Sequence, residues 1–412
     1  MIVGKASLVV DLGNSETRVV TLFGNTELGE PKLRLSILSN KFGELSEKDN
    51  RLLNSPDYNE SNSKVFTVSR TISRNEEGLN TSTVSEEIVN SMFCSGYMCD
   101  IEKGTASIRP SASIKKYDSM ISMYSMRLAL LEGYKHIAEM TNSSIDELDI
   151  EWTISVLLPP SDLELGAEQL KQNILGIDEI NFLIPKFRKD IKIDKVKVFP
   201  EGFCAFIGVV FENRRKIREG FMNVLNSSTL VIDIGAGTTD FCIIKDAKLV
   251  DGSRHSEEIG GNQVFQKINT ELRRKFGKNF PEDSLRDSAV TGTIKVGARE
   301  LDISKEIGVA RKDIATRLSS TIRNYIESSD FSIYDIENIL ICGGGAAPCG
   351  KDMKPLGEFL KEDLKVWMSY SNFLDMPYAD TIVEIDGVNY LQKEQISSRL
   401  LNIIGAGVLS EN

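Results

Sequence analysis

The chain has 412 residues, of which 41% are hydrophobic and 26% are charged, and its formal net charge is −11. A chain of this length can bury two or more compact cores, no apolar run reaches the roughly 20 residues that cross a bilayer, and the N-terminus shows no signal-peptide pattern. The acidic balance argues against direct binding of duplex DNA, which depends on Lys and Arg. The six cysteines form no Cys-x-x-Cys pair, which favours a reduced, cytoplasmic setting. We expect no membrane partner.

The first half is predicted to alternate strands with one long helix. Strands are predicted at 7–12, 17–23, 65–69, 107–114 and 151–158. Residues 39–63 are rich in Asn, Ser and Glu, which is typical of a loop or an insertion. A helix is predicted at 119–141 because four of its apolar residues recur at helical spacings on one face. Pro159-Pro160 ends the last strand.

The second half opens in a similar way. Strands are predicted at 229–234, 240–245, 247–251 and 337–342. One helix begins at Gly260-Gly261-Asn262 and carries an apolar stripe, and another covers 305–329. Two related halves of strands and helices predict an α/β fold, and the cleft between them is the natural place for a ligand.

Two short runs share one design, in which a buried apolar strand ends in an aspartate and a turn rich in glycine and hydroxyl residues. The first run contains Asp11, Gly13, Asn14, Ser15 and Thr17, and the second contains Asp233, Gly235, Gly237, Thr238 and Thr239. Glycine lets backbone N–H groups approach phosphate oxygens, and hydroxyls add donors. The Mg²⁺ that accompanies nucleotide phosphates is usually held by one or two carboxylates. The two runs therefore predict two phosphate-binding hairpins, with Asp11 and Asp233 holding Mg²⁺ through water, although either run alone could be an ordinary strand and turn.

A third glycine-rich turn follows the strand at 337–342. Gly343, Gly344 and Gly345 have no Cβ, so a flat purine could lie against this backbone. A triple glycine is weak evidence alone, but together with the two hairpins it predicts a nucleotide site. Lys305, in the helix predicted at 305–329, could flank the base.

Histidine chemistry is not expected in this chain. Its two histidines, His136 and His255, have no partners at the spacing of metal ligands. We therefore expect both side chains to be structural or exposed, and we expect no zinc site.

These motifs, in this order, resemble the nucleotide pattern of the actin, sugar-kinase and heat-shock-chaperone ATPase superfamily. Its two connecting segments are similar to 198–205 and 404–407, and the stretches 116–131 and 152–160 narrow the resemblance to bacterial plasmid-segregation actins of the ParM type. The resemblance implies an actin-like, ribonuclease-H-like two-domain α/β ATPase fold with a nucleotide cleft between the halves. Residues 25–64 look like a longer insertion.

The resemblance also implies a division into domains. Domain I would span 1–204 and contain a small subdomain at about 35–117. Domain II would span 205–395 with a small subdomain at about 261–330, and residues 396–412 would pack back on domain I.

Glu201 opens the first connecting segment, within Pro200-Glu201-Gly202. In ParM-type actins the glutamate at this place is thought to position the attacking water, so the resemblance implies a catalytic role for Glu201 beside Asp11 and Asp233. The alternative is a carboxylate that stabilises a helix dipole, and both roles could coexist. The residues predicted to bind the nucleotide are Gly13, Asn14, Ser15, Thr17, Gly235, Gly237, Thr238, Thr239, Gly261, Asn262, Lys305, Gly343, Gly344 and Gly345.

The function implied by the resemblance is nucleotide-driven polymerisation. The chain would hydrolyse ATP, with GTP left open, in the presence of Mg²⁺, and would form head-to-tail filaments of paired strands. It would segregate plasmid DNA through a DNA-binding adaptor of the ParR type. The alternative is a monomeric sugar or metabolite kinase of the same superfamily, which would need a base for the substrate hydroxyl, and Glu201 is the one candidate.

Overall fold

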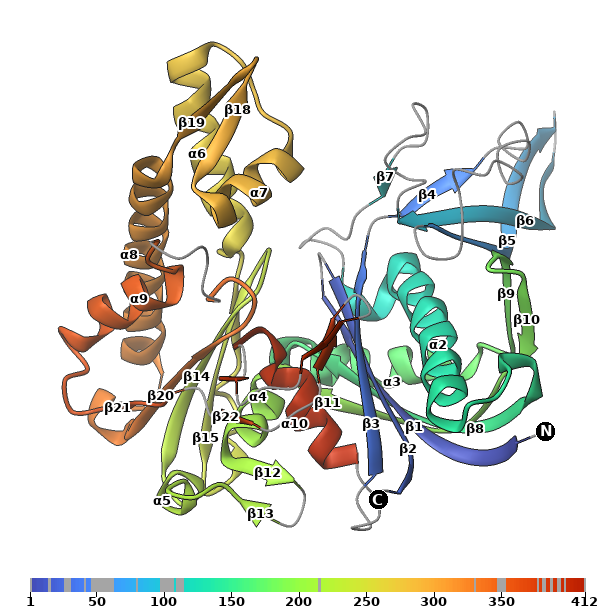
Figure 1. Cartoon of the computed structure of the whole chain (residues 1–412), viewed down its shortest axis with the longest axis horizontal. Coiled ribbons are helices and arrows are strands. Elements are labelled where there is room, and N and C mark those ends of the chain that lie inside the picture. Colours follow the sequence, from blue (N-terminus) through green and yellow to red (C-terminus); the bar gives the residue numbers. More distant parts are fainter. Residues whose placement is uncertain are drawn as a thin grey trace.

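Two lobes, each built on a mixed sheet, make up the molecule (Figure 1). The structure is a computed structural model that describes residues 2–13, 16–25, 31–40, 42–45, 63–78, 81–96, 107–108, 115–213, 216–329, 331–346, 353–375, 378–379, 383–385, 388–390, 394–395 and 398–410. The predicted α/β class is confirmed. The domain boundaries implied by the resemblance stay a prediction.

The first lobe is centred on a five-stranded sheet in the order β11-β8-β1-β2-β3. Its strands are β1 (Ile2–Leu12), β2 (Glu16–Asn25), β3 (Pro31–Ser39), β8 (Leu148–Leu158) and β11 (Lys192–Pro200). β1 and β2 form an antiparallel hairpin, whereas β8 runs parallel to β1 and β11 runs parallel to β8. Such a sheet must be covered on both faces. Leu8 and Val10 accordingly pack into the core that contains helix α2 (Met120–Thr141), while Val9 packs on the other face.

A second sheet extends the first lobe, in the order β10-β9-β5-β6-β4-β7. Its strands are β4 (Phe42–Leu45), β5 (Ser63–Gly78), β6 (Thr81–Gly96), β7 (Ser107–Ile108), β9 (Glu179–Ile184) and β10 (Phe187–Asp190). Strand β5 contains the strand predicted at 65–69 but is much longer, and most of the loop predicted at 39–63 lies outside the described residues. Phe42, Phe66 and Phe93 fix this sheet onto α2 by ring contacts with Tyr124 and with one another.

The second lobe repeats the plan of the first around the sheet β16-β15-β14-β20-β21, with β17 paired to β15. The strands are β14 (Ser228–Ile234), β15 (Thr239–Lys245), β16 (Lys248–Leu249), β17 (His255–Glu257), β20 (Asn338–Cys342) and β21 (Asn372–Phe373). β14 and β15 form an antiparallel hairpin, and β20 runs parallel to β14, as β8 does to β1. The two sequence runs with aspartates therefore start two structurally equivalent sheets.

Helices cover the second sheet and carry a small outer part. They are α6 (Gly261–Phe276), α7 (Glu282–Thr291), α8 (Ser304–Ser328) and α9 (Leu356–Lys365), and β18 (Thr293–Val296) pairs with β19 (Arg299–Asp302) beside α7. The smaller elements are α3 (Leu163–Leu175), α5 (Met222–Leu225), β12 (Phe211–Asn213), β13 (Lys216–Ile217), β22 (Tyr378–Ala379), β23 (Val383–Ile385), β24 (Val388–Tyr390) and β25 (Glu394–Gln395). The helices predicted at 119–141 and 305–329 are confirmed as α2 and α8 within one residue at each end.

Two helices, α4 (Glu201–Val210) and α10 (Leu401–Ser410), pack against each other at the base between the lobes (Figure 1). Their backbones touch at glycines. A Cβ at Gly405 would lie 1.8 Å from the Cys204 carbonyl oxygen, and one at Gly208 would lie 2.5 Å from that of Leu401. These two contacts leave no room for any other residue. Gly405, from the second connecting segment, and Gly208, from helix α4, thus allow the close packing at the junction of the lobes.

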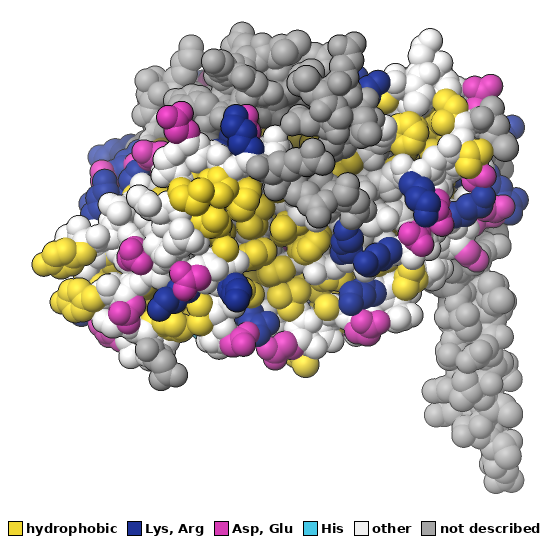
Figure 2. Space-filling view, turned by 90° about the horizontal axis from the view of Figure 1, so that it is seen from below, with side chains coloured by type: hydrophobic (Ala, Val, Ile, Leu, Met, Phe, Trp, Pro, Cys, Tyr) yellow, Lys and Arg dark blue, Asp and Glu magenta, His cyan; other side chains and the backbone are white. Residues whose placement is uncertain are grey.

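The surface seen from below carries hydrophobic side chains in its middle, with charges of both signs around them (Figure 2). Tyr334, just before β20, and Tyr370, just before β21, are about four-fifths exposed, at 77% and 82%. Their ring centroids are 6.0 Å apart. Val366, at 83%, is equally open to solvent. None of the helices in the described ranges has the length and apolar character needed to span a bilayer.

Candidate functional site

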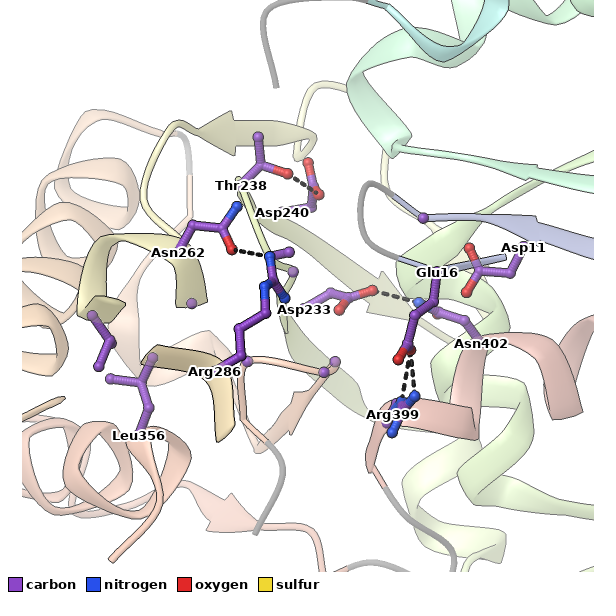
Figure 3. Close-up of a pocket in the computed structure, with 18 of the residues that line it drawn as sticks. Asp11, Glu16, Asp233, Thr238, Asp240, Asn262, Arg286, Leu356, Arg399 and Asn402 are labelled. Carbon is purple, nitrogen blue, oxygen red and sulfur yellow. Dashed lines mark hydrogen bonds and ion pairs between the residues drawn. The ribbon is translucent and has the colours of Figure 1, made fainter. Parts of the chain in front are cut away.

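A cavity of about 430 Å³ lies between the lobes, at the ends of β1 and β14. Asp11, Gly13, Glu16, Arg18, Lys116 and Glu201 line it from the first lobe, and Asp233, Gly235, Thr238, Asp240, Gly261, Asn262, Gly343, Gly344 and Gly345 line it from the second. Arg399, in the 3₁₀ turn η6 (Ser398–Leu400), and Asn402, in α10, complete the wall (Figure 3). The structure therefore brings the two predicted hairpins and the predicted glycine turn to one cavity.

Each hairpin places a second charged residue directly opposite its aspartate. Asp11 pairs in register with Arg18 across β1 and β2, and Asp233 pairs with Asp240 across β14 and β15. Arg18 Nη1 donates to Asp11 Oδ2 at 2.6 Å, so the first hairpin carries a buried ion pair. The second hairpin carries two neighbouring carboxylates instead.

The glycine positions are set by close backbone contacts. A Cβ at Gly13 would lie 2.5 Å from the Glu16 carbonyl oxygen, and one at Gly343, whose φ is +92°, would lie 2.2 Å from Asp233 Oδ1. The N–H of Gly345 donates to the Ile234 carbonyl at 2.7 Å. The triple glycine therefore packs directly on the second hairpin, a requirement that holds whether or not a purine lies beside it.

Helix α6 begins on the second hairpin. The N–H groups of Gly261 and Asn262 donate to the carbonyls of Gly235 and Ala236 at 3.0 and 2.7 Å. A Cβ at Gly260 would come within 2.7 Å of the Ala236 carbonyl oxygen. The turn and the helix start are thus one rigid unit, from which Thr238 and Asn262 reach the cavity.

Several of the carboxylates that line the cavity are paired with basic or amide side chains. Lys116, in the 3₁₀ turn η2 (Lys116–Asp118), donates to Glu201 Oε1, and Arg399 Nε donates to Glu16 Oε2 at 3.0 Å. Asn402 Nδ2 donates to Asp233 Oδ2 (Figure 3).

Burial controls the ionisation of the carboxylates. It raises the pKa of Glu201, Asp233 and Asp240 above their ordinary values, and mutual repulsion among the carboxylates of the cavity adds to the effect. Lys116 opposes the rise at Glu201, and hydrogen bonding from Asn402 opposes it at Asp233. A site of this kind attracts cations and can exchange protons with a bound ligand.

Three polar atoms at the cavity have no hydrogen-bond partner within the part of the chain that the structure describes. They are Asp240 Oδ1, Asn402 Oδ1 and Arg18 Nε, and all three are buried. An unsatisfied buried polar atom costs roughly 1–3 kcal/mol, so its retention calls for an explanation. Two acceptors and one donor beside the same cavity are what a hydrated cation and an anionic ligand would satisfy.

Some residues predicted to bind the nucleotide do not line the cavity. The Thr17 hydroxyl donates to Asn40 Oδ1 at 2.7 Å, and the Thr239 hydroxyl donates to the Ile259 carbonyl at 2.5 Å. Strand alternation explains both, because their neighbours Arg18 and Asp240 take the cavity face. Lys305, on α8, and Gly237, beneath the start of α6, are also outside the lining. Asn14 and Ser15 lie outside the described residues.

Sequence reasoning missed Arg18, Asp240, Arg399 and Asn402 as residues of the cavity. The first two could have been found from the hairpins, since a strand that turns back must place a residue opposite each aspartate. Arg399 and Asn402 have no such signal, because their position depends on how the C-terminal segment crosses the lobes.

Comparisons with known proteins agree with this geometry. Residues 231–355 match a family model described as the archaeal actin homologue MreB-like, C-terminal. The cell shape-determining protein Mbl of Bacillus cereus is 29% identical over 162 residues, which are 34% of this chain and 46% of Mbl. The chain thus spans about half the length of the curated relatives it matches.

Solved structures of low sequence identity match almost the whole chain. Alp7A, described as an actin-like protein, has a TM-score of 0.64 at 16% identity and covers 98% of this chain and 96% of its own. The archaeal actin homologue Ta0583, in complex with ADP, has a TM-score of 0.59 at 14% identity, with 97% of both chains covered. A ParM from a 15-stranded filament of Clostridium botulinum has a TM-score of 0.59 at 15% identity, with 98% of both covered.

These findings show the fold of the protein. The chain has the two-domain fold of actin-like proteins, as the resemblance implied. Within that group, the part of the chain that carries the second hairpin is similar to the MreB-like archaeal actin homologues, and the whole chain has structural neighbours among ParM and Alp7A.

Proposed function

We propose that this chain binds a purine nucleoside triphosphate in the cavity between its lobes and hydrolyses it to the diphosphate. The observation that carries the proposal is that Asp11 and Asp233, from two equivalent hairpins, line one cavity with three glycine turns. The complex of Ta0583 with ADP supports a nucleotide as the ligand. ATP is the expected substrate, and GTP is the alternative.

Magnesium fits the donor set of the cavity. No cluster of three or more side chains that could cage a metal is present among the described residues, and Asp11 and Asp233 each use one oxygen for Arg18 or Asn402. Their remaining oxygens, with the unpartnered oxygens of Asp240 and Asn402, could hold Mg²⁺ through its waters. When bound there, Mg²⁺ would neutralise charge on the phosphate oxygens.

Glu201 and Asp240 are the residues we assign to the attacking water. Both line the cavity, and both are buried carboxylates whose pKa is raised by burial. Phosphoryl transfer needs an in-line water and little covalent chemistry from the protein. In the proposed step, the water oxygen bonds to the γ-phosphorus while the bond between the γ-phosphorus and the bridging oxygen breaks. One of the two carboxylates takes up the water proton, and the products are the diphosphate and inorganic phosphate.

We further propose that the triphosphate state assembles head to tail into filaments. The ParM filament among the structural neighbours supports self-association, and a head-to-tail contact propagates because it does not close. As the finer proposal, the filament would move plasmid DNA in the cytoplasm through a DNA-binding adaptor of the ParR type, because a net charge of −11 disfavours direct contact with DNA.

Titration calorimetry and light scattering test these proposals on the purified protein. We expect heat of binding with MgATP or MgGTP, release of phosphate, and scattering above a critical concentration. Electron microscopy with a slowly hydrolysed analogue should show filaments. If no purine triphosphate binds, the proposed function is wrong. If ATP is consumed in a clear solution, and then only with a sugar or metabolite acceptor, the kinase alternative is correct.

A further inference from the structure

Lys116 and Glu201 come from distant parts of the first lobe and meet at the cavity wall. Lys116 lies in η2, just before α2, and Glu201 is the first residue of α4. The Lys116 ammonium donates to Glu201 Oε1, and the two side chains are 15% and 9% exposed. Both line the cavity, so the ion pair is buried beside the proposed place of water attack.

The charges around Glu201 make this contact more than a surface ion pair. Asp11, Asp233 and Asp240 all repel the ionised Glu201 carboxylate, and burial disfavours it further. Lys116 is the positive charge that counters them. Without it, Glu201 would lose both a fixed partner and the charge that favours its ionised form.

The contact with Lys116 involves one of the two carboxylate oxygens of Glu201. A carboxylate has two oxygens and about four acceptor positions, and Lys116 occupies Oε1. We propose that Lys116 is a positioning residue, which holds Oε1 so that Oε2 accepts a hydrogen bond from the attacking water. This inference rests on the proposed hydrolysis. It assigns a role to Lys116, the first residue of the stretch 116–131 that carries part of the resemblance.

The preceding residue provides a matched control. Lys115 Nζ donates to Asp162 Oδ1 at 2.8 Å, and its side chain is 55% exposed. It does not belong to the cavity lining. Lys115→Met therefore removes the same charge from the same turn without touching Glu201.

The test separates turnover from binding. Single-turnover hydrolysis at saturating MgATP and the nucleotide Kd are measured for wild type, Lys116→Met, Lys116→Arg and Lys115→Met. We expect Lys116→Met to slow hydrolysis by about tenfold or more, since small misplacements of a catalytic group cost this much, with the Kd changed less than about threefold. Lys116→Arg should recover part of the rate, and Lys115→Met should match wild type.

A double variant keeps the test usable if Lys116→Met leaves a buried charge unpaired and fails to fold. Glu201→Gln combined with Lys116→Met removes both charges. If Lys116 acts through Glu201, the double variant hydrolyses ATP as fast as Glu201→Gln alone, because the two changes act on one unit.

Other results would overturn the inference. A Kd raised tenfold by Lys116→Met, with unchanged turnover of bound nucleotide, would mean that Lys116 binds phosphate directly. A double variant slower than Glu201→Gln would mean that Lys116 acts independently of Glu201. A wild-type protein that binds no triphosphate would overturn the proposed function itself, a failure distinct from the first two.

Discussion

Gly343 and Gly344 are adjacent in the chain, but only Gly343 has no room for a side chain. Gly343 has φ +92°, and a Cβ there would lie 2.2 Å from Asp233 Oδ1, whereas the nearest atom to one on Gly344 would be Arg18 Nη2 at 3.6 Å. We expect Gly343→Ala to lower the free energy of unfolding by about 1–3 kcal/mol and to weaken nucleotide binding by displacing Asp233. Gly344→Ala should fold as wild type does. Urea unfolding and calorimetry measure both quantities, and equal behaviour of the two variants would contradict this assignment.

His136 is a structural histidine, as its lack of ligand partners predicted. Thr21 Oγ1 and Ser36 Oγ each lie 2.8 Å from one of its ring nitrogens. Burial, with Arg34 and Lys135 nearby, lowers its pKa to about 4. The unfolded chain, with an ordinary pKa of about 6.5, therefore binds the proton first as the pH falls.

The stability that His136 confers is complete above pH of about 6.5 and is lost as the pH falls towards 4, to a total on the order of 3 kcal/mol. We expect His136→Gln to remove this part of the pH dependence of unfolding. His255→Gln is the control, since its ring is 40% exposed and pairs with Glu257. If wild type and His136→Gln lose stability in parallel between pH 6.5 and 4, this account of His136 is wrong.

Residue-level prediction from the sequence succeeded where the backbone alone decides the position. Asp11, Asp233 and Glu201 stand at the ends of predicted strands or at a helix start, and all three line the cavity. Thr17 and Thr239 were placed on the site by motif, but the two-residue period of a strand turns them away. The catalytic and binding roles of Asp11, Asp233 and Glu201 stay proposals.

Among the elements, the crossing of α4 and α10 depends most on single glycines. Gly405→Ala would place a methyl group 1.8 Å from the Cys204 carbonyl oxygen, whereas a Cβ at Gly407 would meet nothing within 4 Å. We expect Gly405→Ala to force the helices apart and to destabilise the protein by roughly 1–3 kcal/mol. Gly407→Ala should stabilise α10 by about 0.5–1 kcal/mol.

Thermal and urea unfolding of both variants, with wild type alongside, check this pair. A neutral Gly405→Ala would show that the two helices do not pack as closely as described. The two substitutions are the same and lie two residues apart on one helix. Opposite changes in the free energy of unfolding therefore cannot come from helix propensity.

Elements with a strong apolar period could be predicted, and those without one could not. Helices α2 and α6 could be predicted because their apolar residues recur at helical spacing. The long hairpin of β5 and β6 was reduced to a short strand, since its sequence is rich in Ser, Thr, Glu and Asn and lacks a clear alternation. The hairpin also pairs with β9, which lies far away in the chain, and pairing of that kind leaves no local signal.

At the scale of the whole molecule, the exposed pair of Tyr334 and Tyr370 is the surface we expect to join subunits. Aromatic residues dominate protein contacts, and exposed clusters of them are uncommon without a partner. We expect the double change Tyr334→Lys and Tyr370→Lys to raise the critical concentration for filaments at least about tenfold, with nucleotide affinity unchanged. Sedimentation with MgATP measures the first quantity and calorimetry the second.

Val309→Lys is the control for that experiment, because Val309 is 57% exposed on α8 and apart from the tyrosines. It should polymerise as wild type does. Filaments of normal critical concentration from the tyrosine variant would show that the subunits meet through another face.

The segment 398–410 contacts both lobes, through Arg399 on Glu16, Asn402 on Asp233 and Ser410 on Ser155. A ribosome adds these residues after both central sheets have been synthesised. A nascent chain therefore carries two nearly finished lobes before it has the piece that joins their charges. The cleft therefore takes its final form only after the strands of both sheets have been made, because Arg399 and Asn402 follow every one of those strands in the chain.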